Sequence, residues 1–133
     1  MNKEEIVEDR TDRPSPPDGS EARVIEIDHY SEEAPLTYLF GDSARVKIIA
    51  AFVAERGNDI SVSDISRLAG VARSTVYNHL NALEDLGVIE HTRDIENGHS
   101  SLYELNESEE VAEMCHKLDA TVLNTLTESN KFE

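Results

Sequence analysis

Apolar residues that follow Ser61 recur every three or four positions, in two blocks that Gly70 separates. This spacing predicts a short helix over about residues 63–68 and a second helix that begins near Arg73. Ser61 and Ser63 are both candidate N-caps, because a serine oxygen can accept a free amide hydrogen of the first turn. Gly70 stands where the first helix must end and the chain must bend. The pattern therefore predicts a helix-turn-helix.

The second predicted helix has one apolar stripe and one polar face. Val76, Leu80 and Leu83 fall at i, i+4 and i+7, so this stripe must face a core. The polar residues that point away from the stripe, or lie on its flanks, are Ser74, Thr75, Tyr77, Asn78, Asn81 and Asp85. A helix whose first half carries Arg, Ser, Thr, Tyr and Asn can place these groups against base edges and phosphates in a major groove.

Two strand-like runs follow Gly87, which ends the second helix. They are joined by Asn97-Gly98, a strong hairpin signal because both central positions of a tight primed turn need positive φ. The sequence therefore predicts a β-hairpin, and its tip offers Arg93 and His99 beside acidic neighbours.

Two helices are expected before the helix-turn-helix. Residues 35–40 form a short one, in which we expect Leu36, Leu39 and Phe40 to cover one edge of the core. Asp42 is a candidate N-cap for a longer helix from Ala44 to Glu55. Apolar groups occupy most of the circumference of this helix, so Ile48 and Phe52 need a second surface, which we expect to be a helix of a partner subunit.

The C-terminal segment, from about Ser108 to Thr127, predicts an amphipathic helix. Its apolar positions at helical spacing are Val111, Cys115, Leu118, Val122 and Leu126. A single amphipathic helix at the end of a small domain must pack back on that domain or pair with its copy, and we favour pairing.

Acidic residues dominate the composition, with 28 acids against 12 bases and a net charge of −16. Residues 36–105 are the least acidic part of the chain per residue, and a nucleic-acid binder is normally expected to be basic. Such a composition resembles cytoplasmic proteins of halophilic archaea, in which carboxylates maintain solubility in concentrated salt.

Three regions are expected along the chain. Residues 1–34 form an acidic and largely disordered arm, in which a short apolar patch at Val24 to Ile27 lies on the domain or on a partner subunit. Residues 35–105 form the folded domain, and residues 106–133 form the C-terminal helix and tail. The fold class is mainly α with a small β-hairpin.

Several classes of protein are disfavoured. The chain has no apolar run long enough to span a membrane, and its charged N-terminus is unlike a signal peptide, so we expect a soluble cytoplasmic protein without membrane contacts. The single cysteine, Cys115, excludes an internal disulfide and a CxxC metal site. Cys115 and His116 point about 100° apart on a helix, so core packing is the favoured interpretation. No catalytic arrangement and no glycine loop for phosphate is found, so we expect no enzyme, no cofactor and no metal.

The order of these elements resembles the winged helix-turn-helix transcription regulators near the ArsR and MarR families. The resemblance covers about residues 36–126. GDSARVKIIAAF is similar to the first helix of these families, ISRLAGVARSTVYNHLNALEDLGVIE to their helix-turn-helix, and IENGHSSLYELN to their wing. Two features depart from the families: the second helix lacks the paired cysteines of metal-sensing members, and the recognition helix has one arginine and no lysine.

The resemblance implies which residues contact DNA. From the recognition helix these are Arg73, Ser74, Thr75, Tyr77, Asn78 and Asn81. It also implies a phosphate contact near Ser63 and a wing contact from Arg93 or His99.

We therefore expect a homodimeric, sequence-specific regulator of transcription that binds double-stranded DNA, with half-sites about one helical turn apart. Because both subunits of the dimer are acidic and must approach the negatively charged DNA, we expect cations to bridge carboxylates and phosphates at the interface. The alternative is a winged helix used as a protein interaction module, in which acidic segments mimic nucleic acid. A third interpretation, a small-molecule sensor with a pocket at the dimer interface, is compatible with the first.

Overall fold

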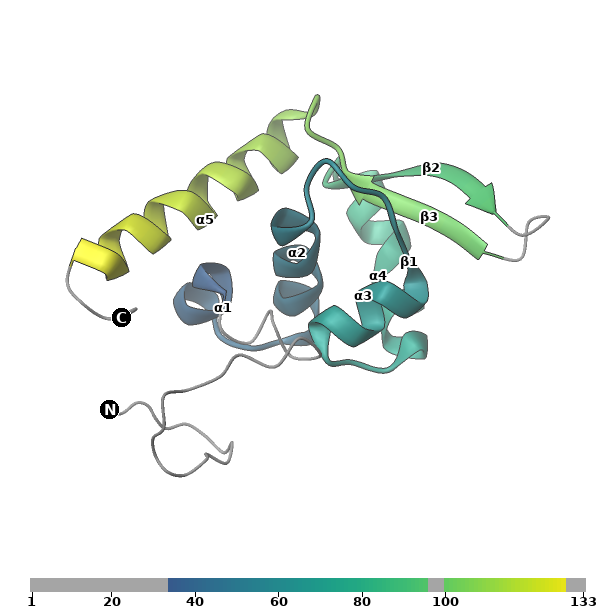
Figure 1. Cartoon of the computed structure of the whole chain (residues 1–133), viewed down its shortest axis with the longest axis horizontal. Helices are drawn as coiled ribbons and strands as arrows, with labels where there is room; N and C mark the ends of the chain where they lie inside the picture. Colours follow the sequence, from purple (N-terminus) through teal and green to yellow (C-terminus); the bar gives the residue numbers. More distant parts are fainter. Residues whose placement is uncertain (1–33, 96–99, 129–133) are drawn as a thin grey trace.

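The chain folds as a winged helix-turn-helix with one additional C-terminal helix (Figure 1). The computed structural model describes residues 34–95 and 100–128. In chain order the elements are α1 (Pro35–Phe40), α2 (Ala44–Ala54), β1 (Ile60–Ser61), α3 (Val62–Ala69), α4 (Arg73–Asp85), β2 (Ile89–Ile95), β3 (Ser100–Leu105) and α5 (Glu110–Glu128). The predicted fold class is confirmed. The predicted arm lies outside the described residues, except for its last residue, and so does the Asn97-Gly98 turn.

The three strands form one antiparallel sheet in the order β1-β3-β2. β2 and β3 form the predicted hairpin, which extends away from the helices as a wing (Figure 1). A bulge between His91 and Arg93 leaves Thr92 without a cross-strand partner. β1 was not predicted, because two residues carry no periodic signal. Its strand conformation depends on pairing with β3, where Ile60 lies opposite Tyr103.

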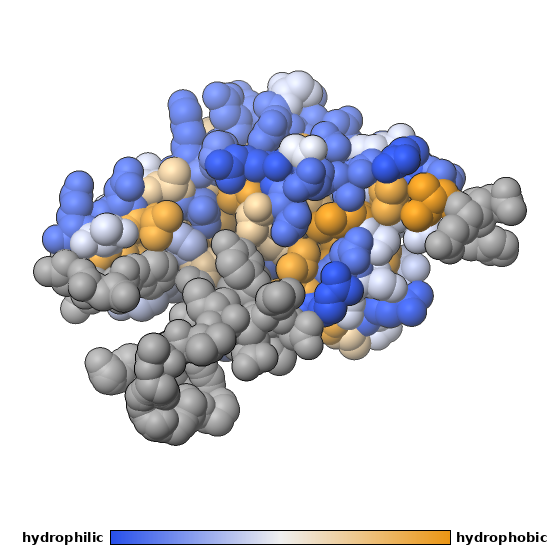
Figure 2. Space-filling model, viewed as in Figure 1, coloured by the Kyte–Doolittle hydropathy of each residue, from blue (hydrophilic) through white to orange (hydrophobic). Residues whose placement is uncertain are grey.

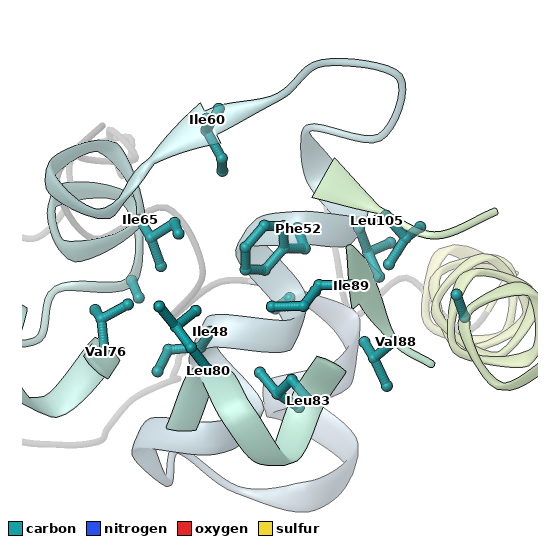
Figure 3. Packing of buried hydrophobic residues seen from close by; sticks show 14 of the residues in the cluster. Ile48, Phe52, Ile60, Ile65, Val76, Leu80, Leu83, Val88, Ile89 and Leu105 are labelled. Atoms are coloured by element: carbon teal, nitrogen blue, oxygen red, sulfur yellow. The ribbon is translucent and has the colours of Figure 1, made fainter. Parts of the chain in front are cut away.

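The hydrophobic core surrounds α2, which lies in the middle of the domain (Figures 1 and 3). α1, α3, α4, α5 and β3 all contact this helix. Ile48 and Phe52 are 0% and 1% exposed within a single chain, so the prediction that they contact a partner subunit is wrong. Figure 3 shows Phe52 between side chains of the sheet and the helices, Ile89 among them. The apolar circumference of α2 is covered by the chain's own elements.

α5 packs on α1 and α2, and its buried face differs from the predicted one. Ala112 and Leu126 are its buried residues, and Cys115 and Val122 are half-buried. Leu126 is therefore covered by its own chain, and the prediction that it lies at a dimer interface is wrong. Four large apolar residues of the helix remain exposed: Val111, Met114, Leu118 and Leu123. The buried face is rotated toward Ala112, a small residue that a hydrophobic periodicity weighs lightly.

α1 is held between the core and α5. Leu36 is buried, whereas Leu39 and Phe40 are exposed, so only the first of the three expected core contacts is correct. Ala34 precedes this helix without a side-chain cap. Burial raises the pKa of Asp119 on α5, and the nearby backbone amide of Leu36 partly opposes that rise. The predicted cap of α2 at Asp42 is also wrong. Ser43 caps this helix instead, and its Oγ accepts from the Val46 amide over 3.3 Å.

Within the described ranges 34–95 and 100–128, no helix combines the length and the apolar composition that a membrane crossing requires.

Candidate nucleic-acid interface

The first helix of the helix-turn-helix, α3, begins with a capping box. The Asp64 amide donates to Ser61 Oγ and the Ser61 amide donates to Asp64 Oδ2, each over 3.1 Å. Burial raises the pKa of Asp64, but hydrogen bonds from Ser61 and Arg67 outweigh it and lower the pKa below its ordinary value. Ser61 is thus the N-cap. Ser63 lies exposed in the first turn, where its side chain is accessible.

The turn between α3 and α4 is set by Gly70. This residue adopts the left-handed conformation, with φ of 70° and ψ of 36°, which glycine reaches without a steric penalty. Ser66 Oγ donates to the carbonyl of Val71 over 2.5 Å and holds the turn. Ala72 then precedes α4 without any side-chain cap, so the first amides of α4 are left free of a side-chain acceptor.

α4 has the buried stripe and the polar outer face that its sequence predicts. Val76, Leu80 and Leu83 are 0%, 4% and 0% exposed and hold the helix on the core (Figure 3). The polar residues exposed on the other side include Arg73, Ser74, Tyr77, Asn78 and Asn81, and the acidic Glu84 and Asp85 are exposed at the end of the helix; Thr75 is half-buried at their edge. The predicted recognition residues are therefore brought together along one helix. Their contact with DNA stays a prediction.

The wing carries Arg93 in an ion pair that the sequence did not reveal. Its Nε lies 3.0 Å from Asp59 Oδ2, and Thr92 donates to the same oxygen over 2.8 Å. The hydrogen bond from Arg93 lowers the pKa of Asp59 most, and the hydrogen bond from Thr92 lowers it further, so this pKa lies below its ordinary value. The charge of Arg93 is thereby partly neutralised, although its side chain is exposed. The other predicted wing residue, His99, lies outside the described residues.

The two strands of the wing carry an aromatic pair and several carboxylates. His91 and Tyr103 lie edge to face, with ring centroids 5.5 Å apart, and His91 is 2.8 Å from Asp94. The hydrogen bond from His91 lowers the pKa of Asp94, and burial raises the pKa of Tyr103. Glu104 of β3 lies opposite Glu90 of β2. The pKa of Glu104 is raised, mainly by burial and to a smaller extent by repulsion from the Glu90 carboxylate. Carboxylates thus accumulate at the base of the wing.

Sequence reasoning also missed Arg45, in the first turn of α2. Arg45 Nε donates to His79 Nδ1 on α4 over 3.0 Å. The only available signal was a basic residue at the start of an otherwise apolar helix. Such a signal does not identify a partner 34 residues away.

Cys115 is half-buried, packs against the core, and has its pKa raised by burial, which disfavours the reactive thiolate. No group of three His, Cys, Asp or Glu side chains suited to a metal ion occurs in the part of the chain that the structure describes.

The comparisons with known proteins agree with this geometry. The IclR helix-turn-helix domain family matches residues 47–93, which run from α2 into β2 and include all of α3 and α4. Among curated protein sequences, none matches the chain.

Two solved structures have a similar fold. Streptococcus pneumoniae FabT, solved in complex with DNA, superimposes with a TM-score of 0.53 at 22% identity, over 71% of this chain and 66% of FabT. A mutant of Lactococcus lactis ZitR in its apo form gives a TM-score of 0.50 at 21% identity, over 72% of this chain and 74% of ZitR. The chain thus spans slightly less than two thirds of FabT. At these identities the likeness establishes the winged helix-turn-helix fold.

Proposed function

We propose that this protein is a sequence-specific regulator of transcription that binds double-stranded DNA with α4 in the major groove. The observation that carries the proposal is the exposed polar face of α4, opposite a buried apolar stripe. The match to the IclR helix-turn-helix domain supports it, and FabT, a protein of the same fold, was solved with DNA bound. The ArsR- and MarR-like order of elements is part of the proposal, as is a place of action in the cytoplasm. An enzymatic function has no support in this family or in these neighbours.

The chemistry of α4 suits the edges of bases. The major groove is about 12 Å wide and admits a helix. An amide such as Asn78 can pair bidentately with adenine, and a guanidinium such as Arg73 can pair with guanine or with a phosphate. The uncapped first turn of α4 also favours a nearby phosphate, because free amides and the helix dipole both attract negative charge.

We further propose that the protein acts as a homodimer through α1 and α5. These two helices contact each other, and Figure 2 shows apolar side chains on the exposed surface of α5. Most of the large apolar residues exposed in the described ranges lie on these helices: Tyr38, Leu39, Phe40, Val111, Met114, Leu118 and Leu123. Large exposed apolar patches mark interaction sites. A second copy is the proposed occupant, because two related α4 helices would then read two half-sites about one turn of DNA apart.

The net charge of −16 requires a particular electrostatic mechanism. We propose that cations bridge carboxylates and phosphates at the interface, as suits a protein of a halophilic archaeon. An ordinary basic protein loses affinity with salt, with a slope of about −0.9 per neutralised phosphate, because it releases counterions. Uptake of cations opposes this release. Affinity is then expected to hold or rise from moderate to molar KCl, and a steep fall over this range would refute the bridging.

The test is a gel-shift titration in high salt that compares the wild type with Arg73→Ala and Asn78→Ala. The duplex is one that the wild type selects from a random-sequence pool. Each variant is expected to lose about 5- to 150-fold in affinity, since a bidentate base contact contributes about 1–3 kcal/mol. An Arg56→Gln variant, which alters an exposed residue beyond the C-terminal end of α2, is the control. Unchanged binding by both α4 variants would refute the proposal and favour a protein interaction module, which the acidic composition also suits.

A further inference from the structure

A hydrogen bond between side chains joins the first turn of α2 to the middle of α4. Arg45 Nε donates to His79 Nδ1 over 3.0 Å, and both residues are half-buried. Because Nδ1 accepts, the neutral imidazole carries its proton on Nε2. The bond uses one of the five guanidinium N–H groups, and the two terminal amino groups of Arg45 form no other side-chain hydrogen bond within residues 34–95 and 100–128.

Arg45 lies along the flank of α4 that faces away from the wing. Tyr77 and Glu84 lie on the flank of α4 that faces the sheet, because both are close enough to Tyr103 of β3 to raise its pKa electrostatically. His79 follows Tyr77 by two positions, so its side chain points about 200° away around the helix. Thr75 lies one turn before His79 on the same flank. Arg45 and Thr75 therefore occupy one edge of the polar face of α4, and the wing occupies the other.

The charge of Arg45 is not neutralised by a carboxylate in residues 34–95 and 100–128. Arg67 and Arg93, in contrast, form ion pairs with Asp64 and Asp59. On a chain with 28 acids and 12 bases, Arg45 thus provides a positive charge beside α4 that no carboxylate of these ranges pairs with, as Arg73 does at the start of α4.

We propose that Arg45 binds a DNA phosphate at the edge of the major groove away from the wing, and that His79 is the positioning residue that orients its guanidinium. The proposal rests on the proposed function. A helix with its side chains is about 10–12 Å across and fills the groove, so the two flanks of α4 face the two phosphate backbones. A guanidinium on such a flank can contact a phosphate through two parallel hydrogen bonds. Asp59 already holds Arg93 on the wing side, so Arg45 supplies the available charge on the opposite side.

Fluorescence anisotropy of the full chain tests this contact on two labelled duplexes. One is the duplex selected by the wild type from a random-sequence pool, and the other is a scrambled duplex of the same composition. The variants are Arg45→Gln, Arg45→Lys, His79→Leu and His79→Asn. Arg56→Gln is the matched control, because it removes the same charge at the opposite end of α2, near Asp119. Thermal unfolding of each variant verifies that it is folded.

If Arg45 contacts a phosphate, its removal should weaken DNA binding to the same extent on both duplexes, whatever their base sequence. Arg45→Gln is expected to lose about tenfold in affinity on both duplexes, as for one lost charge-assisted hydrogen bond. The slope of log K against log salt should change by about 0.9 per protomer relative to the wild type. Arg45→Lys keeps the charge and should recover the slope, with part of the affinity. Arg56→Gln should match the wild type in both affinity and slope.

If His79 positions Arg45, the two His79 variants should differ in DNA affinity. His79→Leu removes the acceptor and should weaken binding, whereas His79→Asn places Oδ1 near the position of Nδ1 and should restore it. Equal losses in both variants would overturn the role of His79. Wild-type binding by Arg45→Gln, or a loss no larger than that of Arg56→Gln, would overturn the phosphate contact. If Arg73→Ala and Asn78→Ala still lose binding in that case, the proposed function stands and only this inference fails.

Discussion

Two phenylalanines in neighbouring helices should respond very differently to truncation. Phe52 of α2 is 1% exposed, whereas Phe40 of α1 is 61% exposed. Phe52→Ala removes a fully buried ring from the centre of the core, and such changes cost about 3–5 kcal/mol. The total stability of a domain is only about 5–15 kcal/mol. Phe52→Ala is thus expected to remove a large part of the free energy of unfolding.

The assay is urea unfolding at fixed KCl, followed by circular dichroism. With an m-value of about 1–3 kcal/mol/M, the midpoint of Phe52→Ala should fall by about 2 M, at every protein concentration. Phe40→Ala should leave the dilute protein within about 0.5 kcal/mol of the wild type. Its effect should grow with protein concentration, because the proposed dimer stabilises the fold by mass action. Similar losses for the two variants in dilute protein, or a loss below about 1 kcal/mol for Phe52→Ala, would refute this description of the core.

Three further predictions concern the capping box, the proposed dimer and a half-buried carboxylate. Ser61→Ala removes the N-cap of α3 and should lower the free energy of unfolding by about 1 kcal/mol, measured in urea; no change would show that the cap is dispensable. Leu118→Glu places a charge in the exposed apolar surface of α5 and should shift the molar mass in light scattering from that of a dimer to that of a monomer. A monomeric wild type in the same measurement would refute the proposed dimer. The pKa of Asp119 is raised in the folded protein by burial, so this group contributes stability that is present below its unfolded pKa and lost as the pH rises through its folded pKa. Asp119→Asn should therefore lose the contribution of this group to the rise in stability on acidification below neutral pH. An unchanged pH profile of Asp119→Asn in urea titrations would contradict this assignment.

The features that depend on short stretches of chain could be predicted from the sequence. The stripe of Val76, Leu80 and Leu83 is a local periodicity, and it correctly oriented the polar face of α4. Gly70 likewise identified the turn of the helix-turn-helix, because its left-handed conformation is a local requirement.

The features that depend on contacts between distant segments could not be predicted. Arg45 is 34 residues from His79, and Asp59 is 34 residues from Arg93. No local pattern pairs such positions. Most of the circumference of α2 is apolar, but periodicity does not tell whether a partner subunit or the chain's own elements cover Ile48 and Phe52. The same reason explains the error at Leu126, because the periodicity of an amphipathic helix does not show whether its apolar face packs on its own chain or on a partner subunit.

The central claim is that α4 reads base edges, and the base preference of the protein tests it most directly. Duplexes selected from a random pool by the wild type and by Asn78→Ala can be sequenced and compared position by position. The account predicts that Asn78→Ala loses the preference for one base in each half-site and keeps the others, because one amide pairs with one base. Identical base preferences for the two proteins, at every position, would contradict it.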